Sequence, residues 1–155
     1  MIKGSCCCGA ISFELSEPPA MMGCCHCSRC RKVGASTIVF VRSDTFRWIG
    51  GEEMVQRYPA VPPYKYDRCF CSCCGTALGE PGGGDSFPIN ANCLDDDPQV
   101  RVQFHEFVAE KPAWAAICDA APQYLGHPVS ASRPVSDIPA NVAVAGCDAI
   151  QRSSP

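Results

Sequence analysis

Seven of the fourteen cysteines in this 155-residue chain fall into three groups with the spacing of metal ligands. The groups are Cys6-x-Cys8, Cys25-x-Cys27-x-x-Cys30 and Cys71-x-x-Cys74. Cysteines one or two residues apart place two thiolates on one side of a tight turn, and two such pairs close a tetrahedron around one metal ion. The pattern therefore predicts that segments more than sixty residues apart in sequence meet at a metal site.

The first and third groups together supply four thiolates, which is the ligand set of a closed, structural zinc site. The middle group then remains, with three thiolates and no fourth partner nearby in sequence. Three protein ligands and one open position are typical of a catalytic zinc ion. We therefore expect two zinc ions, one structural and one catalytic, and we expect the catalytic ion to be held more weakly and to be partly occupied.

An even number of cysteines also allows a scaffold stapled by disulfides. Chains of that class are usually short and secreted, with cysteines spread along the sequence, whereas these are clustered at ligand spacings. Residues 1–6 contain no apolar signal region, and the chain has no apolar run long enough to span a bilayer. We expect a cytoplasmic protein with reduced thiols and no membrane partner.

The charge pattern favours a small-molecule partner. Net charge is −3 with neutral thiols, and seven thiolates with two zinc ions would bring it to about −6. Such a chain has no long-range attraction for nucleic acid or anionic membranes. Positive residues are scattered apart from Arg29, Arg31 and Lys32, which lie in and just after the three-cysteine group. The oligomeric state is left open by the sequence.

Short strand-like stretches alternate with Gly and Pro turns through the first 108 residues. Residues 11–15 alternate apolar and polar side chains, as a half-buried strand does, and residues 36–41 are β-branched and apolar. One helical turn is predicted over residues 28–33, with Gly34 as its stop. This pattern predicts a mainly β fold, either a sandwich or a folded-over sheet. Further predicted strands cover residues 21–25, 45–49, 54–58, 64–70, 87–94 and 100–108.

The C-terminal residues differ from the rest of the chain. Residues 128–155 are rich in Pro, Ser and Ala, and they carry four charges and no aromatic side chain. Such a composition supports no core of its own. We expect a zinc-binding domain over residues 1–127 and an extension over residues 128–155.

Five motifs follow one another along roughly residues 3–125, and all five in this order are highly specific. Together they resemble the glutathione-dependent formaldehyde-activating enzyme family, which also includes centromere protein V. The motifs are Gly4-Ser5-Cys6-x-Cys8-Gly9-Ala10, Cys25-His26-Cys27-Ser28-x-Cys30-Arg31-Lys32, Phe70-Cys71-x-x-Cys74-Gly75-Thr76, Ile89-Asn90-Ala91-Asn92-Cys93-Leu94-Asp95-Asp96, and His105-Glu106-Phe107-Val108 with Lys111-Pro112-Ala113-Trp114.

The resemblance implies a β-tent, a fold of folded-over antiparallel sheets with zinc knuckles that methionine sulfoxide reductase B shares. It also implies condensation of glutathione with formaldehyde to S-hydroxymethylglutathione, classed as a carbon–sulfur lyase reaction. Arg29, Arg31 and Lys32, and after them Arg42, are the candidates for binding the carboxylates of glutathione. By the resemblance, the structural zinc ion lies on Cys6, Cys8, Cys71 and Cys74, and the catalytic zinc ion lies on Cys25, Cys27 and Cys30.

Two classes of function remain open. The first is an enzyme that acts on a thiol or a thiol–aldehyde adduct, and the second is a non-catalytic zinc module that binds a protein partner. The open ligand position favours the enzyme. We expect His26 to donate to a thiolate rather than to ligate metal, and His105 to be packed or hydrogen-bonded on a strand unless an aligned carboxylate makes it a base. Trp48 and Trp114 are expected in the core.

Overall fold

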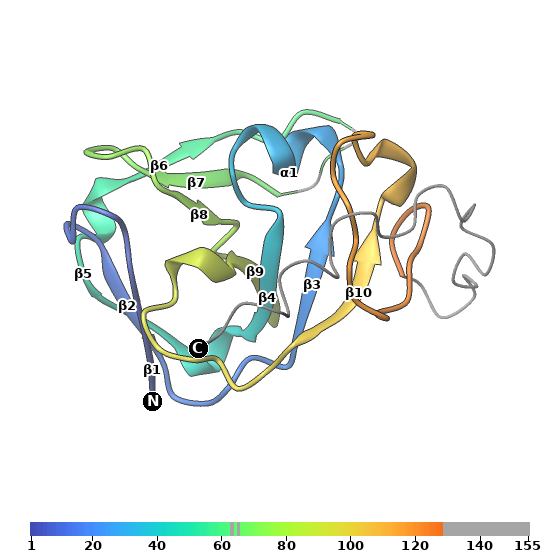
Figure 1. Cartoon of the computed structure of the whole chain (residues 1–155). Coiled ribbons are helices and arrows are strands. Elements are labelled where there is room, and N and C mark those ends of the chain that lie inside the picture. The colour runs from blue at the N-terminus through green and yellow to red at the C-terminus, as the bar shows by residue number, and fades with distance from the viewer. Residues whose placement is uncertain (63, 65, 129–155) are drawn as a thin grey trace, which may run out of the picture.

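The computed structural model describes residues 1–62, 64 and 66–128, and this part of the chain folds into two β-sheets with very little helix (Figure 1). The smaller sheet has the order β1-β2-β5, and the larger has the order β10-β3-β4-β9-β8-β7-β6. A mainly β fold of folded-over sheets is confirmed. The strands are β1 (Ile2–Ser5), β2 (Ser12–Leu15), β3 (Met21–Cys25), β4 (Thr37–Arg42), β5 (Phe46–Gly50), β6 (Val55–Tyr58), β7 (Arg68–Cys71), β8 (Ala77–Gly79), β9 (Ser86–Asn90) and β10 (Val102–Glu106).

The helical segments are short and lie between strands. The α-helix α1 (Ser28–Lys32) begins after the N-cap residue Cys27. Gly34, two residues beyond its end, has a φ of 71°, a left-handed conformation that glycine adopts without steric cost. Four 3₁₀ turns, η1 (Ser43–Thr45), η2 (Glu52–Met54), η3 (Ala91–Cys93) and η4 (Val108–Glu110), complete the described elements.

Side chains of both sheets meet in one core. Phe13 of β2 stacks on Phe46 of β5 with ring centroids 5.3 Å apart, and Phe46 makes an edge contact with Phe87 of β9 at the same distance. Phe46 therefore links the two sheets. Burial of each such side chain contributes about 1.5–3 kcal/mol. The fully buried members of this core are Phe13, Ile11, Leu15, Leu78, Ile89, Val39, Val41, Cys69, Cys71 and Cys93.

One strand pair differs from the antiparallel pattern. β10 runs parallel to β3, and the register sets His105 opposite Cys24 and Glu106 opposite Cys25. The two strands are almost eighty residues apart in sequence, so a periodicity argument does not predict this pairing. Its consequence is that the end of β10 lies beside the three-cysteine segment.

The two tryptophans were both expected in the core, and that prediction is wrong for Trp114. Trp48 is partly buried and packs edge-on against Phe46. Trp114 is 84% exposed, because it lies in the turn that follows η4 rather than on a strand facing the core.

The C-terminal extension, apart from its first residue, lies outside the described residues. The described part also contains no helix that is long and apolar enough to cross a lipid bilayer.

Candidate metal sites

The four cysteines of the first and third groups converge from two different sheets. Their sulfur atoms all lie within 4.8 Å of one another, with Cys6 and Cys8 at 3.6 Å and Cys8 and Cys71 at 3.9 Å. A tetrahedron with about 2.3 Å from metal to sulfur requires sulfurs about 3.8 Å apart, whereas a disulfide requires about 2.05 Å. The four-cysteine cluster, made of Cys6, Cys8, Cys71 and Cys74, therefore has the dimensions of a metal site.

Two tight turns build the four-cysteine cluster. Between β1 and β2, the Gly9 N–H donates to the Cys6 carbonyl at 2.9 Å, and between β7 and β8 the Gly75 N–H donates to the Cys71 carbonyl at 2.8 Å. Both glycines have a φ of 74°, which favours glycine. The Thr76 hydroxyl accepts from the backbone N–H of Cys7 at 3.1 Å and so joins the turns.

Thr76 also acts on one of the ligand thiols. Its hydroxyl lies 3.1 Å from Cys74 Sγ. Hydrogen bonds from the Thr76 side chain and backbone lower the pKa of Cys74 to about 6. Cys74 therefore favours the thiolate form that a metal ligand must have.

The remaining three cysteines come from one continuous segment. Cys25 ends β3, Cys27 caps α1 and Cys30 lies within α1. Their sulfurs lie within 4.8 Å of one another, and all three residues are buried. No fourth His, Cys, Asp or Glu joins this three-cysteine cluster among the described residues. The three-cysteine cluster is therefore enclosed by the protein.

The N-cap geometry favours negative charge on Cys27. Its sulfur accepts from the Cys30 backbone N–H at 3.4 Å. Hydrogen bonds from the Cys25 and Cys30 thiols lower the pKa of Cys27 to about 2, and the contact with Cys27 in turn raises the pKa of Cys25. Cys27 therefore favours the thiolate form that a metal ligand must have. This donor set could hold a metal ion through three thiolates.

Comparison with known proteins agrees with this geometry. The sequence model of the family described as "Glutathione-dependent formaldehyde-activating enzyme" matches residues 1–110. The chain belongs to this family. A Halomonas elongata protein that carries the same description provisionally is 30% identical over 129 residues, which are 76% of this chain and 81% of that protein. A Rhodobacter sphaeroides protein of known crystal structure is 27% identical, with a TM-score of 0.51 over 60% of this chain and 87% of that chain.

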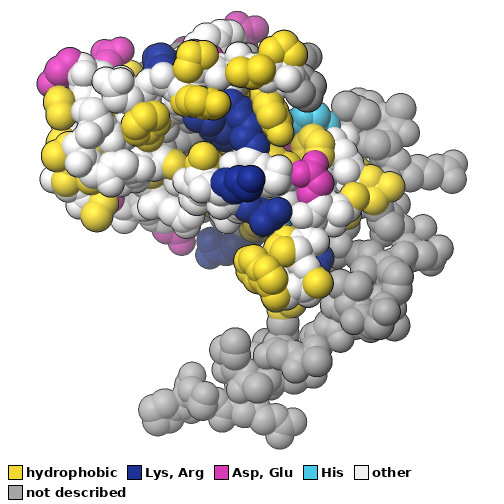
Figure 2. Space-filling model, turned by 90° about the horizontal axis from the view of Figure 1, so that it is seen from above, with side chains coloured by type: hydrophobic (Ala, Val, Ile, Leu, Met, Phe, Trp, Pro, Cys, Tyr) yellow, Lys and Arg dark blue, Asp and Glu magenta, His cyan; other side chains and the backbone are white. Residues whose placement is uncertain are grey.

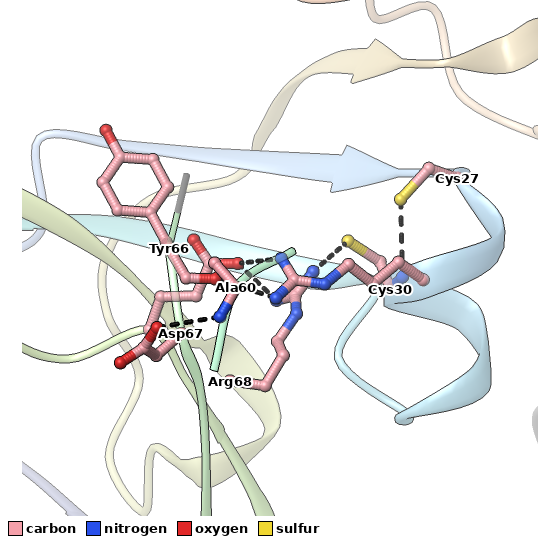
Figure 3. Close-up of polar contacts among 8 residues, drawn as sticks. Cys27, Cys30, Ala60, Tyr66, Asp67 and Arg68 are labelled. Carbon is pink, nitrogen blue, oxygen red and sulfur yellow. Dashed lines mark hydrogen bonds and ion pairs between the residues drawn. The ribbon is translucent and has the colours of Figure 1, made fainter. Parts of the chain in front are cut away.

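The three-cysteine cluster contacts an arginine that was not among the site residues predicted from the sequence. Arg68 Nη2 donates to Cys30 Sγ at 2.9 Å, and Figure 3 shows the guanidinium facing that sulfur. Arg68 Nη1 lies 2.9 Å from Glu80 Oε1. Burial raises the pKa of Glu80, while Arg68 and Arg29 oppose that shift. Arg68 lies three residues before Cys71 in sequence, but this position alone does not predict a role at the other cluster. The contact with Cys30 depends on the fold, which brings the start of β7 close to α1.

The three basic residues predicted to bind carboxylates have different surroundings. Arg29 is largely engaged: Nη1 lies 3.4 Å from Glu80, Nη2 donates to the Tyr66 carbonyl at 2.8 Å, and the guanidinium lies over the Tyr64 ring. Arg31 donates to the His26 carbonyl at 3.2 Å. Lys32 is exposed at the end of α1. Figure 2 shows Lys and Arg side chains gathered in and beside a hollow on the face seen from above.

His26 does not face the cysteines of its own motif. Its Nε2 lies 2.9 Å from His105 Nδ1, and His105 Nε2 lies 3.0 Å from Asp119 Oδ1. We expected His26 to donate a hydrogen bond to a thiolate. The structure instead places it in a hydrogen-bonded chain of two imidazoles and a carboxylate. The aligned carboxylate that would make His105 a base is present, supplied by Asp119.

An open cavity of about 550 Å³ has in its wall Glu80, the carboxylate that pairs with Arg68 and Arg29. Three carboxylates, of Asp67, Glu80 and Asp85, line it together with the single guanidinium of Arg57. Because like charges repel, this lining is unsuited to a ligand with two carboxylates such as glutathione. We therefore do not assign this cavity to glutathione.

Proposed function

We propose that this protein is a cytoplasmic, zinc-dependent carbon–sulfur lyase that forms and cleaves a thiol–aldehyde adduct, with S-hydroxymethylglutathione as the first candidate. The observation that carries the proposal is the three-cysteine cluster: three buried thiols in one segment, with no fourth protein donor among the described residues. Reduced thiols are required at both clusters, which fits a reducing compartment.

Zinc is the metal that we assign to both clusters. Tetrahedral sites built from thiolates alone are typical of zinc, and the sulfur separations of the four-cysteine cluster match such a site. We assign the structural ion to Cys6, Cys8, Cys71 and Cys74, and the catalytic ion to Cys25, Cys27 and Cys30. A zinc ion at the second cluster would supply an open position that lowers the pKa of a bound thiol or polarises an aldehyde oxygen.

The chain's own residues hold the reacting groups in place. Cys27 is fixed by its cap hydrogen bond, and Cys30 is fixed by Arg68. Arg31 and Lys32 lie at the end of α1, in the same segment as the cysteines. We assign them and Arg29 to the carboxylates of glutathione, with Arg29 contributing least because Glu80 already neutralises much of its charge.

A non-catalytic module that binds a protein partner remains the second candidate. The observation in its favour is the exposure of Trp114 and Leu125, at 84% and 64%. Exposed aromatic side chains are enriched at protein interfaces. A module that only binds a protein has no need of a three-cysteine cluster without a fourth donor. We therefore prefer the enzymatic function to the protein-binding function.

NMR exchange kinetics test the proposal. The measurement follows exchange between free glutathione, formaldehyde and their adduct, with and without protein, and subtracts the uncatalysed rate. We expect the wild-type protein to accelerate exchange and the Cys27→Ser variant to leave only the uncatalysed rate. If both proteins behave alike and glutathione shows no saturable binding, then the assignment fails and the binding-module function gains.

A further inference from the structure

We propose that Arg68 binds the oxygen atom of the adduct, the oxygen that comes from the aldehyde, through its Nε–H. This inference rests on the proposed function. It assigns to Arg68 the distinction between a glutathione thioether that carries a hydroxyl group and one that carries an alkyl group alone. Arg68 starts β7, 38 residues after Cys30 in sequence, and only the fold brings its side chain to Cys30.

Arg68 is buried at 7% exposure, and two of its three nitrogens are satisfied. Nη2 donates to Cys30 Sγ at 2.9 Å, and Nη1 faces Glu80 Oε1 at 2.9 Å. The third nitrogen, Nε, is the one buried side-chain N or O atom that lacks a hydrogen-bond partner in the described part of the chain. A buried donor of a charged group is costly to leave unpaired, so its retention indicates a partner that is absent from the apoprotein.

The shape of the guanidinium gives the direction of that partner. The group is planar with its donors in a fixed fork, and Nε–H lies parallel to one N–H of Nη2 on the same edge. Because Nη2 points at Cys30 Sγ, Nε–H is directed to the same side, next to the three-cysteine cluster (Figure 3). A paired oxygen acceptor would therefore lie beside the sulfur ligands.

The charges around Arg68 favour a neutral or weakly charged oxygen rather than a second carboxylate. Glu80 contacts Arg68 at 2.9 Å and Arg29 at 3.4 Å, so one carboxylate already sits between the two guanidinium groups. Glu80 contacts the Nη1 side of the fork, and no hydrogen-bond acceptor contacts Nε among the described residues. An aldehyde or hydroxymethyl oxygen needs one directed donor, and Nε–H supplies one.

This donor also suits the change in charge during the reaction. When the thiol sulfur forms its bond to the aldehyde carbon, the π electron pair of C=O moves onto oxygen. The proton lost by the thiol then returns to that oxygen from solvent, so that glutathione and formaldehyde together give the adduct with no other reactant. A charged donor placed at the oxygen stabilises it most when its negative charge is largest.

Binding of two matched ligands tests the inference. S-hydroxymethylglutathione, formed from glutathione and formaldehyde, carries CH₂–OH on sulfur, and S-ethylglutathione carries CH₂–CH₃ in its place. We expect the wild-type protein to bind the hydroxymethyl ligand tighter by about tenfold or more, the value of a hydrogen bond to a charged group. In Arg68→Lys, which keeps the charge and loses the fork, the preference should fall to within about twofold.

The control variant is Arg57→Lys. Arg57 also donates to a cysteine sulfur, Cys69 Sγ at 3.3 Å, but Cys69 belongs to neither cluster. Like Arg68→Lys, the control adds one lysine that can react with formaldehyde. It should keep the wild-type preference for the hydroxymethyl ligand. Zinc content and a thermal melt accompany each variant. If Arg68→Lys does not retain its zinc, Arg68→Met, which has no hydrogen-bond donor in its side chain, takes its place.

The outcomes separate the two claims. A preference that Arg68→Lys loses and Arg57→Lys keeps supports the inference. An undiminished preference in Arg68→Lys overturns it and leaves the proposed function standing, as does equal binding of both ligands by the wild-type protein. If the wild-type protein binds neither ligand, then the proposed function fails and the inference fails with it.

Discussion

His26 Nε2 and His105 Nδ1 lie 2.9 Å apart, which joins the loop between two cluster cysteines to the parallel strand β10. Burial, together with the neighbouring His105, lowers the pKa of His26, so that its imidazole is neutral at pH 7. His105 Nε2 faces the Asp119 carboxylate, which can only accept when ionised. If His105 Nδ1 accepts, His26 Nε2–H donates to it, and the backbone His26 N–H donates to the Glu106 carbonyl at 3.0 Å.

This pair predicts a measurable cost for His105→Leu. The substitution leaves the half-buried His26 Nε2–H without its acceptor, and a group left unpaired in this way costs about 1–3 kcal/mol. Asp119→Asn should cost less than about 1 kcal/mol, because the Asp119 side chain is 49% exposed and water can replace it. Urea unfolding monitored by circular dichroism gives both values. Equal losses in the two variants would contradict the role of the imidazole pair.

Cys71→Ser should abolish folding. The four-cysteine cluster joins the turn between β1 and β2 to the turn between β7 and β8. A metal ion bound there would contribute to folding directly, on the order of 10 kcal/mol in small zinc domains. Cys73→Ser is the matched control, because Cys73 lies in the same turn, is exposed and is outside the cluster. Solubility, melting and zinc content are measured for both. A soluble Cys71→Ser protein that melts cooperatively with unchanged zinc would refute the assignment.

Cys27→Ser should lose the second metal ion and keep the fold. Serine is a preferred N-cap residue, so the cap hydrogen bond to the Cys30 N–H survives the substitution. We expect wild-type protein to contain between one and two zinc ions per chain and Cys27→Ser to contain one, with nearly the same melting temperature. Cys24→Ser, whose thiol contacts Thr37 rather than the cluster, is the control. A large loss of stability in Cys27→Ser alone would make the site structural.

Gly23→Ala tests the packing of β3 against β10. An added Cβ at Gly23 would lie 2.3 Å from Cζ of the buried Phe104 ring, so the ring or the strand must move. We expect a loss of about 1–3 kcal/mol of unfolding free energy, as for overpacked cores. Gly126→Ala, where a Cβ would meet no atom within 4 Å, should be close to neutral. Unfolding free energies that do not differ between the variants would show that the two strands pack less closely than described.

The cysteine spacing predicted more of the candidate sites than of the surrounding structure. Spacing alone separated Cys25, Cys27 and Cys30 from the four cysteines of the other cluster, because short-range spacing in tight turns is a local property. Residues 21–25 were predicted as a strand and form β3 with the same bounds. Local alternation and turn residues carry that information.

What the sequence did not predict depends on contacts between distant segments. Arg68 reaches Cys30 across 38 residues, and His105 reaches His26 across 79. Both contacts follow from sheet order, including the parallel pairing of β10 with β3, which no local pattern encodes. The prediction that Trp114 lies in the core was wrong for a related reason. The sequence around an aromatic residue outside a strand does not show whether its side chain faces the core or the solvent.

The central claim is that the three-cysteine cluster holds a metal ion whose open position takes a substrate thiol. Cobalt(II) in place of zinc reports each thiolate ligand through its sulfur-to-metal charge-transfer absorption, and glutathione is titrated against the cobalt protein with S-methylglutathione as the control. We predict a saturable rise in absorption equal to one additional thiolate with glutathione, no rise with S-methylglutathione, and no rise in Cys27→Ser. Absorption that stays constant as glutathione is added to the fully loaded wild-type protein would contradict the claim.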